Sequence, residues 1–335
     1  MTEADAAAAI LWTGATLYAL FGGADFGAGL WDLLAGDAER GERPRALIQR
    51  SLTPVWEANH VWLIFILVVL WTAFPEAFGA IMSTLYVPLA LAALGIVLRG
   101  AGFAFRKSVE SLPAQRALGA SFAISSVMTP FFMGTVVGAI ASGNVPAEGN
   151  GEAFSSWLEP LPLLTGAMFV ASGAYLAAIF LIADSRRDGD SEMEEYFRSR
   201  ALWAAAAAGA FAVAGLFALN DEASSIFDRL VAEGLPLVAL SGACGTAVLI
   251  MLVRGRVRGL RPLAILAVAA VIWGWGVAQF PYLLPTSLDI ATAAAPGPTL
   301  VSVLIVFCVA AVTILPALAL LYSLAQRDIV GESGE

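Results

Sequence analysis

The sequence has few of the groups from which soluble enzymes build their sites. Only 13% of its 335 residues are charged, and it has one histidine and two cysteines. Cys244 and Cys308 each lie inside an apolar run, so neither a disulfide framework nor a thiolate metal site is indicated, and we expect both to be small core residues. The net charge of -9 comes mostly from acids in the loops and at the two ends, which we interpret as a solubilising fringe, and we expect no nucleic-acid partner.

Apolar residues are what the chain has in excess. They make up 59% of the sequence, with a mean hydropathy of +0.80, which is more apolar surface than one soluble core can bury. The composition therefore predicts an all-α integral membrane protein. Apolar windows of membrane-spanning length predict nine spans, at residues 8–33, 55–75, 79–105, 117–142, 162–183, 201–219, 234–253, 261–285 and 298–325.

Basic residues predict the orientation of these spans, because short cytoplasmic loops are enriched in Lys and Arg. Such residues follow the first, third, fifth and seventh spans and the last one, namely Arg40, Arg43, Arg45, Arg50, Arg106, Lys107, Arg116, Arg186, Arg187, Arg198, Arg200, Arg254, Arg256, Arg258, Arg261 and Arg327. The intervening linkers carry only Arg229. The N-terminus is therefore expected outside and the C-terminus in the cytoplasm. Residues 1–9 lack the basic region of a secretory signal, so we expect the first span to be retained.

The linkers are too short for a separate soluble domain. We expect a single polytopic membrane domain over residues 1–335, with helical halves at roughly 1–145 and 146–335. The Gly- and Pro-containing stretch at 144–151 is the predicted midpoint.

Four ionisable side chains are predicted to share one depth. Asp25 lies deep in the first span, Glu57 and His60 lie in the first turns of the second, and Arg99 lies near the inner end of the third. Glu57 and His60 are three residues apart, so they share a helix face, while Asn59 and Trp56 are expected to point elsewhere. Ionisable groups at membrane depth are costly, which makes this cluster a candidate proton, ion or substrate path.

Two interpretations of the cluster remain open. In the first, Glu57, Asn59, His60 and Asp25 form a proton entry route from the cytoplasm. In the second, Arg99 pairs with Asp25 or Glu57 and only ties three helices together. Tryptophans near the cluster, including Trp56 and Trp62, are expected to be structural anchors near the membrane interface.

The same segments resemble a known family. P-V-W-E-A-N-H-V-W-L at 54–63 resembles the P-x-W-[DE]-x-N-x-x-W-L signature of subunit II of cytochrome bd-type quinol oxidases. G-G-A-D-F-G-A-G at 22–29 is similar to the D-G-x-D-x-G-x-G of the first helix in that family. Further similar segments, L-R-G-A-G-F-A-F-R, P-F-F-M-G-T-V-V-G and F-P-Y-L-L-P-T-S, follow in the family's order.

The resemblance implies a fold and a role. It implies nine helices arranged as two four-helix bundles plus a peripheral helix, partnered by a subunit I that carries haem b and haem d, or haem b alone. It leaves room for small accessory subunits and for a structural quinone, and it links the positions of Glu57 and Asp25 to a proton route. We expect no haem on this chain, because haem iron takes ligands such as His, Met or Cys and one histidine cannot serve three haems.

The sequence also departs from the family pattern. Gly22 stands where the first acid of the first-helix motif is expected, and Ala104 stands where an acid is frequent. The alternative function is a proton-coupled secondary transporter, in which Asp25, Glu57 and Arg99 couple protons to a solute. It is disfavoured because the polar groups lie near one face instead of at mid-membrane.

Overall fold

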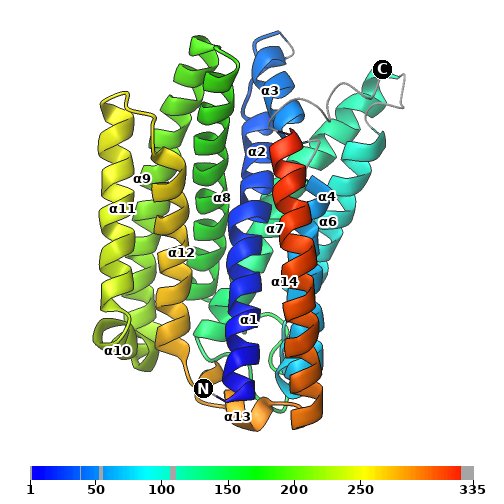
Figure 1. Ribbon diagram of the computed structural model, residues 1–335, viewed down its shortest axis with the longest axis vertical. Helices are drawn as coiled ribbons and strands as arrows, with labels where there is room; N and C mark the ends of the chain where they lie inside the picture. Colours follow the sequence, from blue (N-terminus) through cyan, green and yellow to red (C-terminus); the bar gives the residue numbers. More distant parts are fainter. Residues whose placement is uncertain (1, 38, 53–55, 106–110, 326–335) are drawn as a thin grey trace.

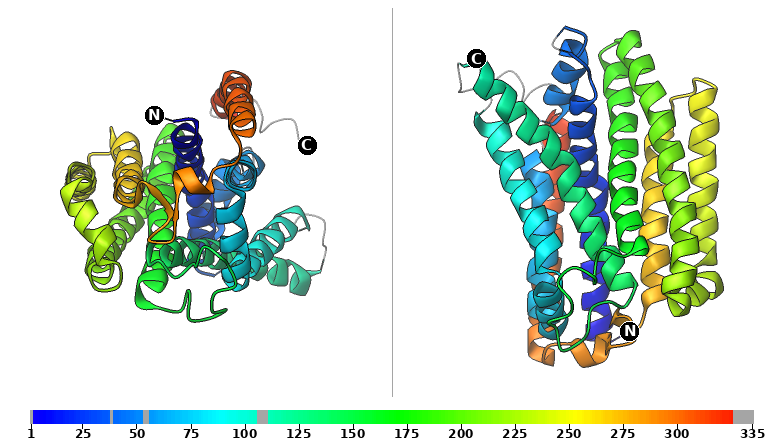
Figure 2. Two further views of the ribbon diagram at one scale, coloured as in Figure 1. Left: turned by 90° about the horizontal axis from the view of Figure 1, so that it is seen from below. Right: turned by 180° about the vertical axis from the view of Figure 1, so that it is seen from behind.

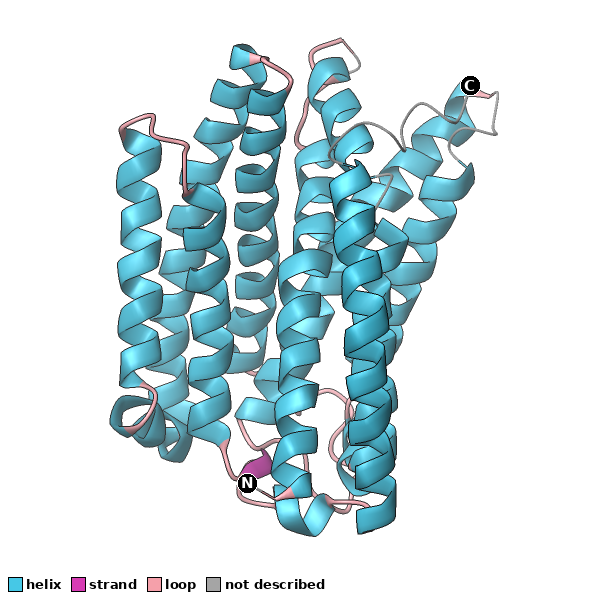
Figure 3. Ribbon diagram, viewed as in Figure 1, coloured by secondary structure: helices cyan, strands magenta, loops and turns pink. Residues whose placement is uncertain are grey.

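The computed structural model describes residues 2–37, 39–52, 56–105 and 111–325, without the side chains of residues 52, 56, 103, 112–116, 322 and 325. The described chain is almost entirely helical, as Figure 3 shows, which confirms the predicted all-α class. The elements are α1 (Glu3–Leu17), the π-helical turn η1 (Tyr18–Gly22), α2 (Gly23–Leu33), α3 (Glu42–Leu52), α4 (Trp56–Ala73), α5 (Pro75–Thr84), α6 (Tyr86–Phe105), α7 (Leu112–Ala141), α8 (Pro160–Arg187), α9 (Ser191–Glu222), α10 (Ser224–Ala232), α11 (Leu235–Val253), α12 (Leu260–Gln279), β1 (Tyr282–Leu284), β2 (Leu288–Asp289), α13 (Ile290–Ala293) and α14 (Gly297–Ala325).

Seven helical segments of the described chain are long and apolar enough to cross a membrane, and an eighth crossing is added if the bent pair α4–α5 counts as one. The chain bends by 118° between these two helices, at the point where Pro75 begins α5. Several helices extend beyond the apolar windows of the sequence. Helix α9, for example, begins at Ser191, ten residues before the window that predicted it. The window 261–285 instead overshoots its helix, because α12 ends at Gln279 and β1 follows.

The prediction of one continuous helix over 79–105 is wrong. Within this range, α5 ends at Thr84 and α6 begins at Tyr86. Pro88 explains the break, because proline has no N–H to donate and its ring clashes with the carbonyl four residues earlier, which here belongs to Thr84.

The helices form two groups around the long first segment α1–η1–α2 (Figure 1). Helices α8, α9, α11 and α12 lie on one side, and α4, α6 and α7 lie on the other. The view along the helices in Figure 2 shows α14 standing apart at the edge, where it packs on α1 and α4. The two larger buried hydrophobic clusters each include residues of the first segment, so this segment joins the two groups.

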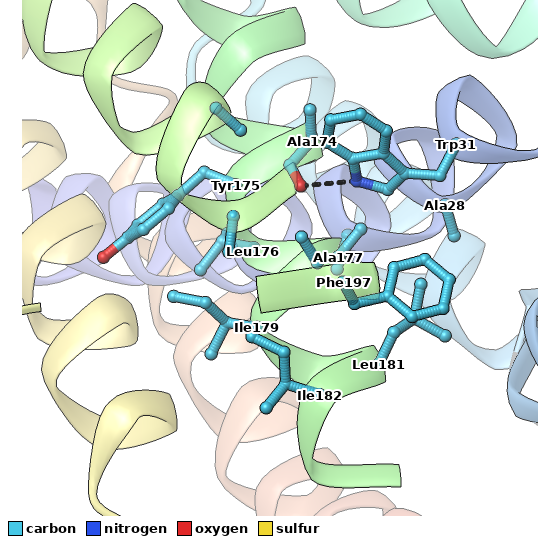
Figure 4. Packing of buried hydrophobic residues seen from close by; sticks show 14 of the residues in the cluster. Ala28, Trp31, Ala174, Tyr175, Leu176, Ala177, Ile179, Leu181, Ile182 and Phe197 are labelled. Atoms are coloured by element: carbon cyan, nitrogen blue, oxygen red, sulfur yellow. Dashed lines mark hydrogen bonds between the residues drawn. The ribbon is translucent and has the colours of Figure 1, made fainter. Parts of the chain in front are cut away.

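Glycines allow α2 and α8 to approach at backbone distance. A Cβ at Gly27 would lie 2.0 Å from the carbonyl oxygen of Gly173, a separation that real side chains do not reach. Small residues permit such close packing in membranes. Figure 4 shows the neighbouring core, where the indole N–H of Trp31 donates to the carbonyl of Ala174 at 2.9 Å.

One end of the molecule is rich in arginine, and we call it the arginine-rich end. It holds α3, the α8–α9 turn and the α11–α12 loop, at the top of Figure 1. Arg43 of α3 pairs with Asp190 at 2.9 Å and also with Glu192, and Arg50 pairs with Asp188. These ion pairs fasten α3 to the start of α9.

The Asp190 carboxylate is stabilised in its charged form. The backbone N–H of Met193 and the guanidinium of Arg43 hold the pKa of Asp190 below its usual value. Because the pKa is lowered in the folded protein, the contribution of this group to stability is present at neutral pH. It is lost only as the pH falls through that lowered pKa.

The cysteine prediction is half right. Cys244 is buried, as expected, but Cys308 is exposed. Cys308 belongs to α14, whose apolar window has no residue buried within this chain. An apolar run in a membrane helix therefore does not imply a place in the protein core, since lipid receives apolar side chains equally well.

Candidate functional site

The candidate site is a buried polar cluster formed by α2, α4, α6 and α7. It consists of Asp25, Asn59, Arg99 and Ser126, each at most 6% exposed. All four elements present these residues in the half of the bundle nearer the arginine-rich end. The structure therefore brings together Asp25 and Arg99, which were predicted from the sequence to lie at one depth. Asn59 of α4 lies against Asp25.

Asn59 is the residue that joins α4 to Asp25. Its side-chain nitrogen donates to Oδ2 of Asp25, and both groups are buried. Glu57 and His60 share a different face of α4. Burying a carboxylate without a donor is costly, so this hydrogen bond accounts for part of the placement of Asp25.

Arg99 binds oxygens that belong to two helices. Its Nη2 donates to the backbone carbonyl of Asp25 at 2.8 Å, and its Nη1 donates to the Ser126 hydroxyl. Ser126 in turn donates to the carbonyl of Phe122 at 2.6 Å. Within the described residues, Arg99 thus reaches the main chain of Asp25 instead of forming a direct ion pair with its carboxylate.

Aromatic rings enclose the rest of the guanidinium. Its Cζ lies 4.8 Å from the ring centre of Phe26 and 4.6 Å from that of Phe122, a geometry that stabilises a cation on ring faces. A Cβ at Gly29 would lie 2.1 Å from the Ser126 hydroxyl and 2.9 Å from Nη1 of Arg99. Gly29 therefore leaves the space in which Arg99 and Ser126 meet.

His60 lies beside the cluster among aromatic side chains. Its ring centre is 6.0 Å from that of Phe26 and 6.4 Å from that of Tyr18. Tyr18 begins the π-helical turn η1, and such turns are frequent at functional sites. Neither Tyr18 nor Ser126 could be recognised as a site residue from the sequence, because a single hydroxyl in an apolar run gives no distinct signal.

Glu57 lies exposed in the first turn of α4, at the arginine-rich end. Trp62 is half-buried, with its ring 6.4 Å from that of Phe65. The side chain of Trp56, and the first two residues of the 54–63 motif, lie outside the described residues. Within the described residues, no group of three or more His, Cys, Asp or Glu side chains is placed to hold a metal ion.

The structure leads to a prediction for Arg99. We expect Arg99→Ala to lower the yield and melting temperature of the protein, because the buried Asp25 carbonyl and Ser126 hydroxyl would lose the donor that Arg99 provides. A buried polar group left without its hydrogen-bond partner typically costs about 1–3 kcal/mol. The measurement is thermal unfolding in detergent, with Arg254→Ala, at an exposed arginine, as the matched control. Equal melting temperatures for wild type and Arg99→Ala would rule out a structural role for this guanidinium.

Fold and site together define a polytopic helical membrane protein with an ionisable cluster buried near one end. The sequence model of the family described as "Cytochrome bd terminal oxidase subunit II" matches residues 4–325. The chain therefore belongs to the family of subunit II of cytochrome bd terminal oxidases.

Individual relatives agree with this family. The chain is 29% identical over 114 residues to the cytochrome bd ubiquinol oxidase subunit 2 of Bacillus subtilis, covering 34% of this chain and 33% of that protein. It is 28% identical over 126 residues to the cytochrome bd-I ubiquinol oxidase subunit 2 of Escherichia coli, covering 38% and 32%. These matches span about a third of the length of the curated relatives.

One solved structure has the same fold along nearly the whole chain. The bd oxidase from Geobacillus thermodenitrificans contains a chain that superposes with a TM-score of 0.82 at 22% identity. The superposition covers 97% of this chain and 98% of that one. The similarity extends the shared fold beyond the segments where sequence identity is detected.

Proposed function

We propose that this chain is the non-haem subunit of a cytochrome bd-type quinol:oxygen oxidoreductase. In this proposal a separate subunit I carries the haems, and neither chain is active alone. Family membership over residues 4–325 supports the proposal. The complex would oxidise quinol and reduce dioxygen to water, in the cytoplasmic membrane of a prokaryote.

The proposed arrangement has nine membrane crossings. They are the seven apolar segments together with α4 and the broken helix α5–α6. The first bundle comprises α1–α2, α4, α5–α6 and α7, and the second comprises α8, α9, α11 and α12, so that the halves divide near residue 145. Helix α14 is then the peripheral helix. The arginine-rich end faces the cytoplasm, which leaves the N-terminus outside and the C-terminus inside.

The proposed role of the cluster is a proton entry route for oxygen reduction in the neighbouring subunit I. The supporting observation is that an exposed carboxylate, Glu57, stands on the helix that also places Asn59 against the buried carboxylate of Asp25. Glu57 would collect protons from the cytoplasmic side, and Asp25 would receive them through His60 and bridging water, while the hydrogen bond from Asn59 holds the Asp25 carboxylate in place. Arg99, held by main-chain and hydroxyl oxygens, leaves the Asp25 carboxylate free of a direct ion pair and thus able to exchange protons.

Glu57→Gln tests the entry end of this route. We expect the variant complex to assemble with its normal haem spectrum and to consume oxygen several-fold more slowly, because an amide does not take up a proton at neutral pH. The assay is oxygen consumption per haem in membranes supplied with quinol.

Glu76→Gln is the matched control, since Glu76 is an exposed glutamate in the first turn of α5, at the far end of α4 from Glu57. We expect it to leave turnover unchanged. Wild-type turnover in Glu57→Gln would refute the entry role. Loss of haem or of the complex would instead assign Glu57 to the subunit interface.

A further inference from the structure

The hydroxyl of Tyr18 is a polar group inside the membrane that the proposed route does not yet use. Its oxygen is buried, and it has no hydrogen-bond partner among the described residues. A buried hydroxyl without a partner is unfavourable by about 1–3 kcal/mol. Such a group requires an explanation beyond packing, since phenylalanine would fill the same space without that cost.

Tyr18 lies where a route from Asp25 would continue. Its ring stands beside His60, with 6.4 Å between the ring centres, and the hydroxyl is in electrostatic range of both Asp25 and Arg99. Its Cα precedes that of Asp25 by seven residues, about 10 Å further from the arginine-rich end, and its ring leans back over Gly22 toward Asp25. The Tyr18 hydroxyl therefore lies beside the cluster on the side of the membrane interior.

The backbone is shaped to hold this ring. Tyr18 and Gly22 are the first and last residues of the π-helical turn. A Cβ at Gly22 would lie 2.7 Å from Cε2 of Tyr18, so any larger residue would move the ring from its place. Gly22 is also the position at which the sequence departs from the acid of the family motif, and the ring of Tyr18 lies over this position.

We propose that the Tyr18 hydroxyl is a member of the proton route, located beyond Asp25 and His60 on the way to the membrane interior. This inference rests on the proposed function. In each transfer, the phenol oxygen accepts a proton from the inlet side, through water, as its own proton leaves toward the interior. One proton enters and one departs, so the phenol is neutral before and after, and no electron is exchanged.

Tyr18→Phe in the assembled oxidase tests the inference, because it removes the hydroxyl and keeps the ring. We expect oxygen consumption per haem to fall about tenfold or more, with an unchanged haem spectrum. We also expect the solvent deuterium isotope effect on turnover to increase, since proton delivery becomes rate-limiting. A merely structural role would not change the isotope effect.

Tyr175→Phe is the matched control. The hydroxyl of Tyr175 is also buried without a partner among the described residues, but it lies in the core formed with α8, away from the cluster. We expect its turnover and isotope effect to equal those of wild type. Gly22→Ala is a second test, since it keeps the hydroxyl and displaces the ring, and it should also slow turnover per haem.

The outcomes separate this inference from the proposed function. Normal turnover in Tyr18→Phe together with slow turnover in Glu57→Gln would overturn the role of Tyr18 and leave the entry route intact. Normal turnover in both variants would overturn both. If Tyr18→Phe loses haem, Gly22→Ala decides: slow turnover with an increased isotope effect supports the inference, and wild-type values overturn it.

Discussion

Asp25→Asn should reduce oxygen consumption by the complex by about two orders of magnitude. This side chain is the carboxylate of the buried cluster. It is 6% exposed and accepts a hydrogen bond from Asn59. Asparagine keeps the shape and an oxygen acceptor but does not carry a proton, and removing a positioned proton carrier typically costs about 10²–10⁴ in rate. The measurement is turnover per haem in purified complex, combined with the haem absorption spectrum.

The control for Asp25→Asn is Asp228→Asn. Asp228 is an exposed aspartate on α10, at the end opposite the arginine-rich end, and we expect its replacement to leave turnover unchanged. Asp25→Asn turnover within twofold of wild type would be incompatible with proton passage through this carboxyl group. The ion-pair interpretation of the cluster would then be the better one.

Gly27→Ala should have the largest effect on assembly. Its Cβ would lie 2.0 Å from the carbonyl oxygen and 2.2 Å from the carbonyl carbon of Gly173. These are backbone atoms that no rotamer change can move away. The two helices would have to separate, and overpacking of this kind typically costs about 1–3 kcal/mol or more. We expect little or no folded protein, measured as membrane yield and as the elution profile in detergent.

Gly100→Ala provides the comparison for Gly27→Ala. A Cβ at Gly100 would meet no atom within 4 Å, and alanine has the better helix propensity. We expect normal yield and an equal or higher melting temperature. Equal yields for the two variants would show that α2 and α8 do not pack at backbone distance in the membrane.

Much of the fold follows from hydropathy alone. Apolar windows predicted the long helices because each span must hide its backbone polar groups from lipid. The windows did not predict the break at Leu85, although Pro88 supplies its cause three residues later. They also gave no sign of the π-helical turn at Tyr18–Gly22, since an extra residue in a helical turn leaves the apolar character of the segment unchanged.

The site was only partly predictable, for a geometric reason. Asp25, Glu57, His60 and Arg99 were placed at one depth by counting residues along each helix. Rotation of each helix about its axis is not fixed by that count. Successive residues of a helix point about 100° apart, so only the structure shows that Asn59 faces Asp25.

Partners within the apolar runs were equally hidden. Ser126 resembles any serine that bonds to its own helix, as it does to Phe122, until Arg99 is placed against it. Cys308 resembles a core residue until α14 is found at the edge of the bundle. In a membrane, apolar sequence does not distinguish contact with protein from contact with lipid.

The ion pairs of α3 carry a consequence for biogenesis. The ion-pair partners of Arg43 and Arg50 lie 138 to 149 residues later in the chain. At translation rates of about 5–20 residues per second, those partners leave the ribosome on the order of ten seconds after α3. The two halves of the protein therefore form these ion pairs only after the five helices α4 to α8 have been synthesised.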